Sequence, residues 1–131
     1  NGTGEVRSCM ERMAFQYLVY DKNYSSLNKK HKSIGFIYTM NINEDMVKEW
    51  GYDSVLSSTE KYFERIFGAS ESLFVTDTYQ FSDYSKYVVT AFDEVHKAER
   101  RREVFPIDCE KAFEIGVRFA TKEPPTSGAA E

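Results

Sequence analysis

The sequence predicts an α/β fold in which a parallel sheet is layered by helices. Two short apolar runs, at residues 33–38 and 73–76, have the β-branched and aromatic content typical of strands covered on both faces. Segments of helical periodicity stand before, between and after these runs, so the expected order is helix, strand, helix, strand, helix, helix. Because parallel strands need a crossover connection, the helical segment between the runs favours a parallel pair.

Two helical regions are expected in the first half of the chain. The first covers residues 3–20, with Thr3 as its cap and with one apolar face formed by Val6, Met10, Met13, Tyr17 and Tyr20. The second begins at Asn43, is interrupted by Gly51, and continues over residues 54–67 until Gly68 ends it. The expected inward face of this second region consists of Val55, Thr59, Tyr62 or Phe63, and Ile66.

The last third of the chain predicts two further helices and a tail. One helix is expected over residues 83–102, with Ser82 as its cap, and Asp108 is expected to cap the last helix. The charged run at residues 99–103 is interpreted as a solvated helix end, with an anion site as the second interpretation. Residues 1–120 are expected to form one domain part, and residues 121–131 a disordered tail.

The composition of the chain argues against several classes of partner. The chain has 131 residues, the size of one domain, and 21 acidic against 17 basic side chains give a net charge of −4, which argues against a nucleic-acid partner. No apolar run is long enough to cross a bilayer and no signal-peptide pattern opens the chain, so a cytoplasmic protein without a membrane partner is expected. Cys9 and Cys109 are isolated, which predicts buried thiols and no metal site.

Candidate chemistry lies at one edge of the predicted sheet. Ligands of open parallel sheets bind beyond the carboxyl ends of the strands, so residues 38–41 and 76–79 are expected to form a ligand edge, with residues 2–5 beside them. Asp77 is the best-placed acid there, although a turn residue bonded to its own backbone is the favoured interpretation. His96 is expected to be an ordinary surface histidine.

Six segments carry a resemblance to a known family: residues 3–12, 35–41, 59–68, 76–87, 101–109 and 111–114. They resemble parts of the flavodoxin-like NAD(P)H-dependent FMN reductases, and in particular of a clostridial-type branch of that family. Residues 3–12 resemble the helix after the third strand, and residues 35–41 resemble the fourth strand and its loop. The resemblance spans residues 3–120 and corresponds to the C-terminal part of the family's flavodoxin-like domain.

The resemblance implies a flavoprotein oxidoreductase that binds FMN, takes electrons from NAD(P)H and passes them to a small-molecule acceptor. It implies flavin-ring contacts by Thr39, Met40 and Asn41, and a loop beneath the ring that contains Asn1, Gly2 and Thr3. The residues themselves leave other interpretations open. Met40 is also suited to a core, Asn41 to a helix-entry turn, and Thr3 to a helix cap.

A second function class competes with the flavoenzyme. The chain is alternatively a non-catalytic α/β fragment or an interaction module that packs on a partner chain, either a second copy in a homo-oligomer or a missing N-terminal half. The unpaired edge of a two-stranded apolar sheet is the feature that favours such association.

Overall fold

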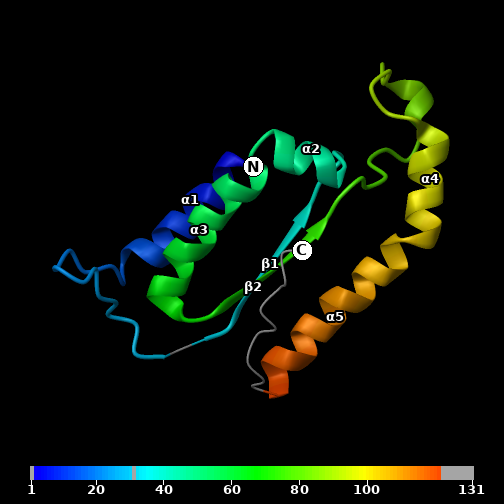
Figure 1. The fold of residues 1–131 in the computed structure, drawn as a ribbon. Coiled ribbons are helices and arrows are strands. Elements are labelled where there is room, and N and C mark those ends of the chain that lie inside the picture. The colour runs from blue at the N-terminus through cyan, green and yellow to red at the C-terminus, as the bar shows by residue number, and fades with distance from the viewer. Residues whose placement is uncertain (1, 31, 122–131) are drawn as a thin grey trace. The chain divides into compact units, whose positions relative to one another are not determined.

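The computed structural model describes residues 2–30 and 32–121 (Figure 1). In these residues the chain forms five α-helices, one short 3-10 helix and a two-stranded parallel sheet. The elements follow one another as α1 (Gly4–Phe15), β1 (Ile34–Thr39), α2 (Glu44–Glu49), α3 (Tyr52–Phe67), β2 (Ser70–Val75), η1 (Tyr84–Lys86), α4 (Glu94–Glu103) and α5 (Phe105–Thr121). The predicted α/β class is confirmed. The predicted tail lies outside the described residues apart from Thr121, which ends α5.

The two strands pair in parallel, and their loops continue the pairing. Ile34 donates its backbone N–H to the carbonyl of Ala69, and Met40 donates to the carbonyl of Val75, so the register advances in the same direction along both strands. The connection between the strands runs through α2 and α3. This is the crossover that a parallel pair requires.

The chain divides into two compact units. The first unit contains residues 2–36 and 52–71. Its core is a cluster of Ala14 from α1 with Phe63 and Ile66 from α3, each no more than 3% exposed. Aromatic and aliphatic side chains pack around this cluster: Met10, Tyr17, Ile34, Phe36, Tyr62 and Phe67. The small Ala14 side chain allows α1 to lie close to the aromatic residues of α3.

The second unit contains residues 37–51 and 72–121. Its buried apolar side chains come from several elements: Val47, Val75, Tyr84 and Ile115. Two charged side chains, Lys97 and Asp108, are buried with them at 1% and 4% exposure. A charged group so deeply buried must be paired, and these pairs form the candidate site described below.

The helix beginning predicted at residue 83 is wrong, because the chain first forms a compact aromatic turn. Asp83 caps only the short η1, and the hydroxyl of Tyr84 accepts a hydrogen bond from the N–H of Gln80 at 3.1 Å. The rings of Phe81 and Tyr87 stack with their centroids 4.1 Å apart. α4 begins only at Glu94, where the Asp93 carboxylate accepts from the N–H groups of the first turn.

The beginning of the last helix also differs from the prediction. α5 begins at Phe105, so Asp108 does not cap the helix but lies inside its first turn. Pro106 is tolerated there because the N–H groups of a first turn have no partner within the helix. Similarly, α1 ends at Phe15 and not at Tyr20, and Leu18 pairs with Ser26 in an isolated antiparallel bridge.

Three predictions of burial are wrong. β1 alternates between half-buried and exposed side chains, so only one of its faces is covered, and Ile37 is 52% exposed. The inward face of α3 contains Leu56 in place of Val55, which is 50% exposed. Both cysteines are exposed free thiols. The exposed face of β1 shows that a short apolar run does not by itself establish that a strand is covered on both faces.

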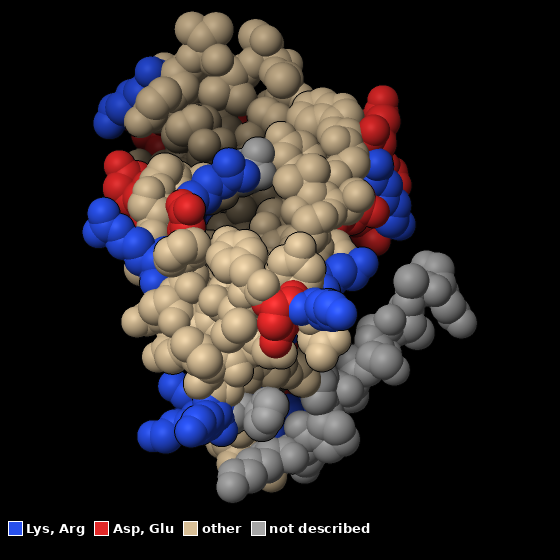
Figure 2. All heavy atoms as spheres, turned by 90° about the vertical axis from the view of Figure 1, so that its left-hand side faces the viewer, with Lys and Arg blue, Asp and Glu red and all other residues tan. Residues whose placement is uncertain are grey.

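Charged side chains of both signs occur on the face of the molecule that Figure 2 shows. On the face shown in Figure 2, basic and acidic side chains of the described residues are interspersed with neutral ones. No helix within residues 2–30 and 32–121 combines the length and the apolar character that a membrane span needs.

Candidate functional site

The loops that follow the two strands are bonded to each other at the carboxyl edge of the sheet. Thr78 donates its N–H to the Met40 carbonyl at 3.0 Å, and Asp77 donates to the Ile42 carbonyl at 2.8 Å. The prediction that these two loops lie together is confirmed by these bonds. Asp77 has a φ of +56°, a left-handed conformation that aspartate adopts more readily than most residues.

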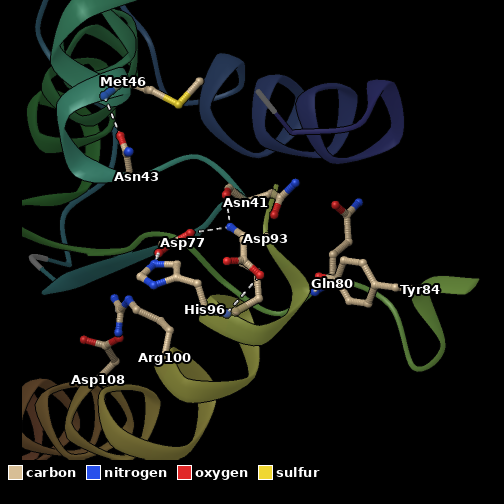
Figure 3. Close-up of polar contacts among 11 residues, drawn as sticks. Asn41, Asn43, Met46, Asp77, Gln80, Tyr84, Asp93, His96, Arg100 and Asp108 are labelled. Atoms are coloured by element: carbon tan, nitrogen blue, oxygen red, sulfur yellow. Dashed lines mark hydrogen bonds and ion pairs between the residues drawn. The ribbon is translucent and has the colours of Figure 1, made fainter. Parts of the chain in front are cut away.

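The side chain of Asp77 connects this loop edge to α4. Its Oδ1 accepts a hydrogen bond from the ammonium group of Lys97, and its Oδ2 lies 2.7 Å from Nε2 of His96 (Figure 3). The Lys97 ammonium also donates to the backbone carbonyl of Asn41 and lies 4.7 Å from the centre of the Phe92 ring. One buried lysine therefore ties both loops to the helix.

The electrostatics of Asp77 favour the charged carboxylate. Its partial burial raises the pKa, but the hydrogen bonds and positive charges of Lys97 and His96 outweigh this effect, and the pKa lies below its usual value of 3.8. An ionised carboxylate only accepts hydrogen bonds, so Nε2 of His96 is assigned as the protonated nitrogen. The His96 side chain is 60% exposed. The histidine is therefore at the surface as predicted, but its orientation is held by Asp77.

A second ion pair lies one helical turn further along α4. Nη2 of Arg100 donates to Oδ2 of Asp108 at 3.2 Å, and the two side chains are 16% and 5% exposed (Figure 3). Lys111 lies 3.9 Å from the other oxygen of Asp108. Nη1 of Arg100 is buried and has no hydrogen-bond partner among the described residues. The interpretation of residues 99–103 as a wholly solvated helix end is therefore wrong for Arg100.

A cavity of about 190 Å³ adjoins this ion pair. Its walls come from the end of β2, the loop after it, the last turn of α4 and the first turn of α5. The lining residues are Val75, Thr76, Thr78, Tyr79, Arg100, Arg101, Phe105 and Asp108. The guanidinium of Arg101 lies over the ring of Tyr79, 5.3 Å from its centre.

The residues predicted to contact a flavin belong, where the structure describes them, to two different units. Thr39, Met40 and Asn41 lie together at the end of β1, where Thr39 is exposed and the other two are half-buried. Oδ1 of Asn41 is a buried oxygen with no hydrogen-bond partner among the described residues. Asn41 is not the cap of α2, because Asn43 has that role.

The other predicted contacts belong to the beginning of the chain. Thr3 is the N-cap of α1, and its hydroxyl accepts from the Val6 N–H at 3.4 Å. Gly2 precedes this cap in the first unit, and Asn1 lies outside the described residues.

Sequence reasoning missed Lys97 and the pair of Arg100 with Asp108. Val95 belongs to the same helix as Lys97 and is 67% exposed, whereas Lys97 is buried, so the apolar residue does not mark the inward face of α4. The only available signal was Asp77 at a strand exit, an acid that needs a cationic partner if it is buried.

Comparisons of the chain with protein-family models, with curated proteins and with solved structures found no match. Among the described residues, no cluster of three or more histidine, cysteine, aspartate or glutamate side chains could hold a metal ion.

Proposed function

We propose that this chain supplies flavin-ring contacts in a flavodoxin-like oxidoreductase that uses FMN and NAD(P)H. The observation that carries the proposal is the buried Oδ1 of Asn41, an acceptor without a partner at the carboxyl edge of a parallel sheet. This edge is where open α/β sheets bind mononucleotides. The resemblance of residues 35–41 to a flavin-contacting loop supports the same assignment.

The chemistry of the Asn41 side chain fits the edge of an isoalloxazine ring. That edge carries both an N–H donor and carbonyl acceptors, and a carboxamide can accept from the first and donate to the second. A buried acceptor that lacks a partner costs on the order of 1–3 kcal/mol, so a ring N–H that reached Asn41 would relieve this penalty.

The neighbouring residues hold Asn41 in place. Lys97 binds the Asn41 backbone carbonyl, and Met40 is bonded through its N–H and its carbonyl to Val75 and Thr78. Such positioning residues limit the loss of loop entropy on binding. The flavin, when bound, supplies the hydride and electron transfer to a small-molecule acceptor, while the protein binds and orients it.

A flavin titration tests the proposal. The chain is titrated with riboflavin and with FMN, and binding is followed by quenching of flavin fluorescence. We expect saturable quenching by both, because Asn41 is assigned to the ring and not to the phosphate. Asn41→Ala should weaken binding about fivefold, the effect of losing one hydrogen bond.

Asn23→Ala is the matched control, because Asn23 is an exposed asparagine of the first unit. This variant should bind both flavins as the unaltered chain does. Absence of quenching by both flavins, or an Asn41→Ala variant with unchanged affinity, would overturn the proposal.

A second candidate function is an interaction module that packs on another copy of the chain. It is favoured by α5, which exposes Phe113 at 67% and Val117 at 43%. These two residues are four positions apart and therefore lie on one side of the helix. Exposed apolar stripes of this kind are typical of surfaces that bind another protein.

A further inference from the structure

The cavity beside α4 has a cationic lining. Arg100 and Arg101 each contribute a positive charge to its walls, and Asp108 contributes one negative charge. Both oxygens of Asp108 already face cations, since Arg100 lies 3.2 Å from one and Lys111 lies 3.9 Å from the other. The remaining field in the cavity therefore favours an anion.

Arg100 has hydrogen-bonding capacity left inside the protein. Its side chain is 16% exposed, and Asp108 uses only Nη2, whereas Nη1 is buried without a partner among the described residues. Guanidinium groups are rarely left in this state, because an unsatisfied buried donor is unfavourable. An external acceptor at Nη1 would complete the hydrogen bonding of the side chain.

Arg101 holds a second guanidinium at the same cavity. Its group lies 5.3 Å from the centre of the Tyr79 ring, a cation–π distance that favours a defined position over free motion. Thr76 and Thr78, on the loop after β2, also line this cavity and each carries a hydroxyl group. Two guanidinium groups and two hydroxyls together form a donor set for the oxygens of an anion.

We propose that this cavity is an oxyanion-binding site that takes a phosphate or carboxylate group of a small molecule. Nη1 of Arg100 and the guanidinium of Arg101 bind the anionic oxygens, and Thr76 and Thr78 donate further hydrogen bonds. The cavity of about 190 Å³ is smaller than the roughly 300 Å³ of the smallest usual ligand pockets, so it takes an anionic group with few attached atoms. Phe105 and Val75 form the apolar wall against which those atoms pack.

NMR titration of the isotope-labelled chain tests this site without any flavin, so its outcome is independent of the proposed function. Inorganic phosphate and acetate are added separately at constant ionic strength, with sodium chloride as the blank. We expect saturable shifts of the backbone amides of Thr76, Thr78 and Tyr79 with at least one of the two anions. The anion that binds more tightly identifies the group as phosphate or carboxylate.

Variants separate the site from general charge attraction. Arg101→Gln should weaken anion binding about tenfold, the effect of losing charge-assisted hydrogen bonds. Arg102→Gln is the matched control, because Arg102 is 66% exposed, pairs with Glu103 and does not line the cavity. Thr78→Val leaves the charge unchanged and should also weaken binding.

Three results would overturn the inference. The first is the absence of saturable shifts with both anions. The second is equal weakening by Arg101→Gln and Arg102→Gln, which would show diffuse attraction to the α4 arginines. The third is a set of shifts that centres on residues away from the cavity.

Discussion

The ammonium group of Lys97 binds the carboxylate of Asp77 inside the second unit, where the Lys97 side chain is only 1% exposed. The same ammonium group binds the carbonyl of Asn41, so α4 is fastened to the loops of both strands through one atom. Burying a cation is unfavourable unless its charge is compensated and its protons are bonded. Three partners satisfy these needs here: a carboxylate, a carbonyl and the face of the Phe92 ring.

Lys97→Met is expected to lower the free energy of unfolding by about 3 kcal/mol or more, because it leaves Asp77 charged and without its main partner. Lys86→Met is the control, since Lys86 pairs with Asp83 at the surface with 72% exposure and should change stability by less than about 1 kcal/mol. Urea unfolding followed by circular dichroism measures both. Similar stability of the two variants would contradict the role assigned to Lys97.

The low pKa of Asp77 predicts a pH dependence of stability. Desolvation opposes the charged form, but Lys97 and His96 hold the folded-state pKa below the usual 3.8. The resulting stabilisation is fully present above the pKa of the unfolded chain, about 3.9, and is lost as the pH falls through the folded pKa. The unaltered chain should therefore lose stability more steeply below about pH 4 than Asp77→Asn does. If the stability of the unaltered chain and that of Asp77→Asn fell in parallel during acid denaturation, the stabilising role assigned to the charged Asp77 would be contradicted.

The inward face of α3 can be tested by two neighbouring substitutions. Leu56→Ala should destabilise the protein by about 2–4 kcal/mol, because Leu56 is 8% exposed. Val55→Ala should cost less than about 1 kcal/mol, because half of the Val55 side chain is exposed. Thermal melts of the two variants measure the difference. A larger loss of stability in Val55→Ala than in Leu56→Ala would instead support the inward face predicted from periodicity.

Gly68 and Gly51 differ in the space around them. Both have positive φ, but a Cβ on Gly68 would lie 2.7 Å from the Lys32 carbonyl oxygen, whereas Gly51 faces open space. Gly51→Ala should cost on the order of 1 kcal/mol for the backbone conformation alone. Gly68→Ala should lower the free energy of unfolding by clearly more, because the added Cβ would clash with backbone that is itself held in place. Lys32 donates its N–H to the carbonyl of Phe67. Equal unfolding free energies of the two variants would contradict this prediction and show that the backbone at Lys32 shifts to make room for the Cβ.

If the chain acts as an interaction module, the exposed Phe113 and Val117 of α5 should cause copies of the chain to associate. Phe113→Lys should shift a concentration-dependent oligomer towards monomer in analytical ultracentrifugation, because it places a charge in an apolar contact. Glu114→Lys is the control, since Glu114 is exposed next to Phe113 on a different side of α5. A chain that stays monomeric at all concentrations would contradict the module.

Much of the fold follows from local patterns in the sequence. The apolar runs placed both strands within a few residues, and the alternation of helical and extended segments gave the observed order of elements. Thr3, Asn43 and Gly68 were recognised as helix boundaries, because caps act through hydrogen bonds within one turn. The errors at residues 83–93 arose where aromatic contacts outside the helix replaced helical bonding.

The candidate sites depended on tertiary structure. Asp77 and Lys97 are 20 residues apart, and Arg100 meets Asp108 across the junction of α4 and α5, so no periodicity in one segment could pair them. The sequence by itself determined most of the segments that become helices and strands, although not the turn at residues 83–93, since that choice rests largely on neighbours a few positions away. Tertiary structure decided which charges are buried, because the partner that makes burial of Lys97 or Arg100 tolerable arrives from another element of the fold.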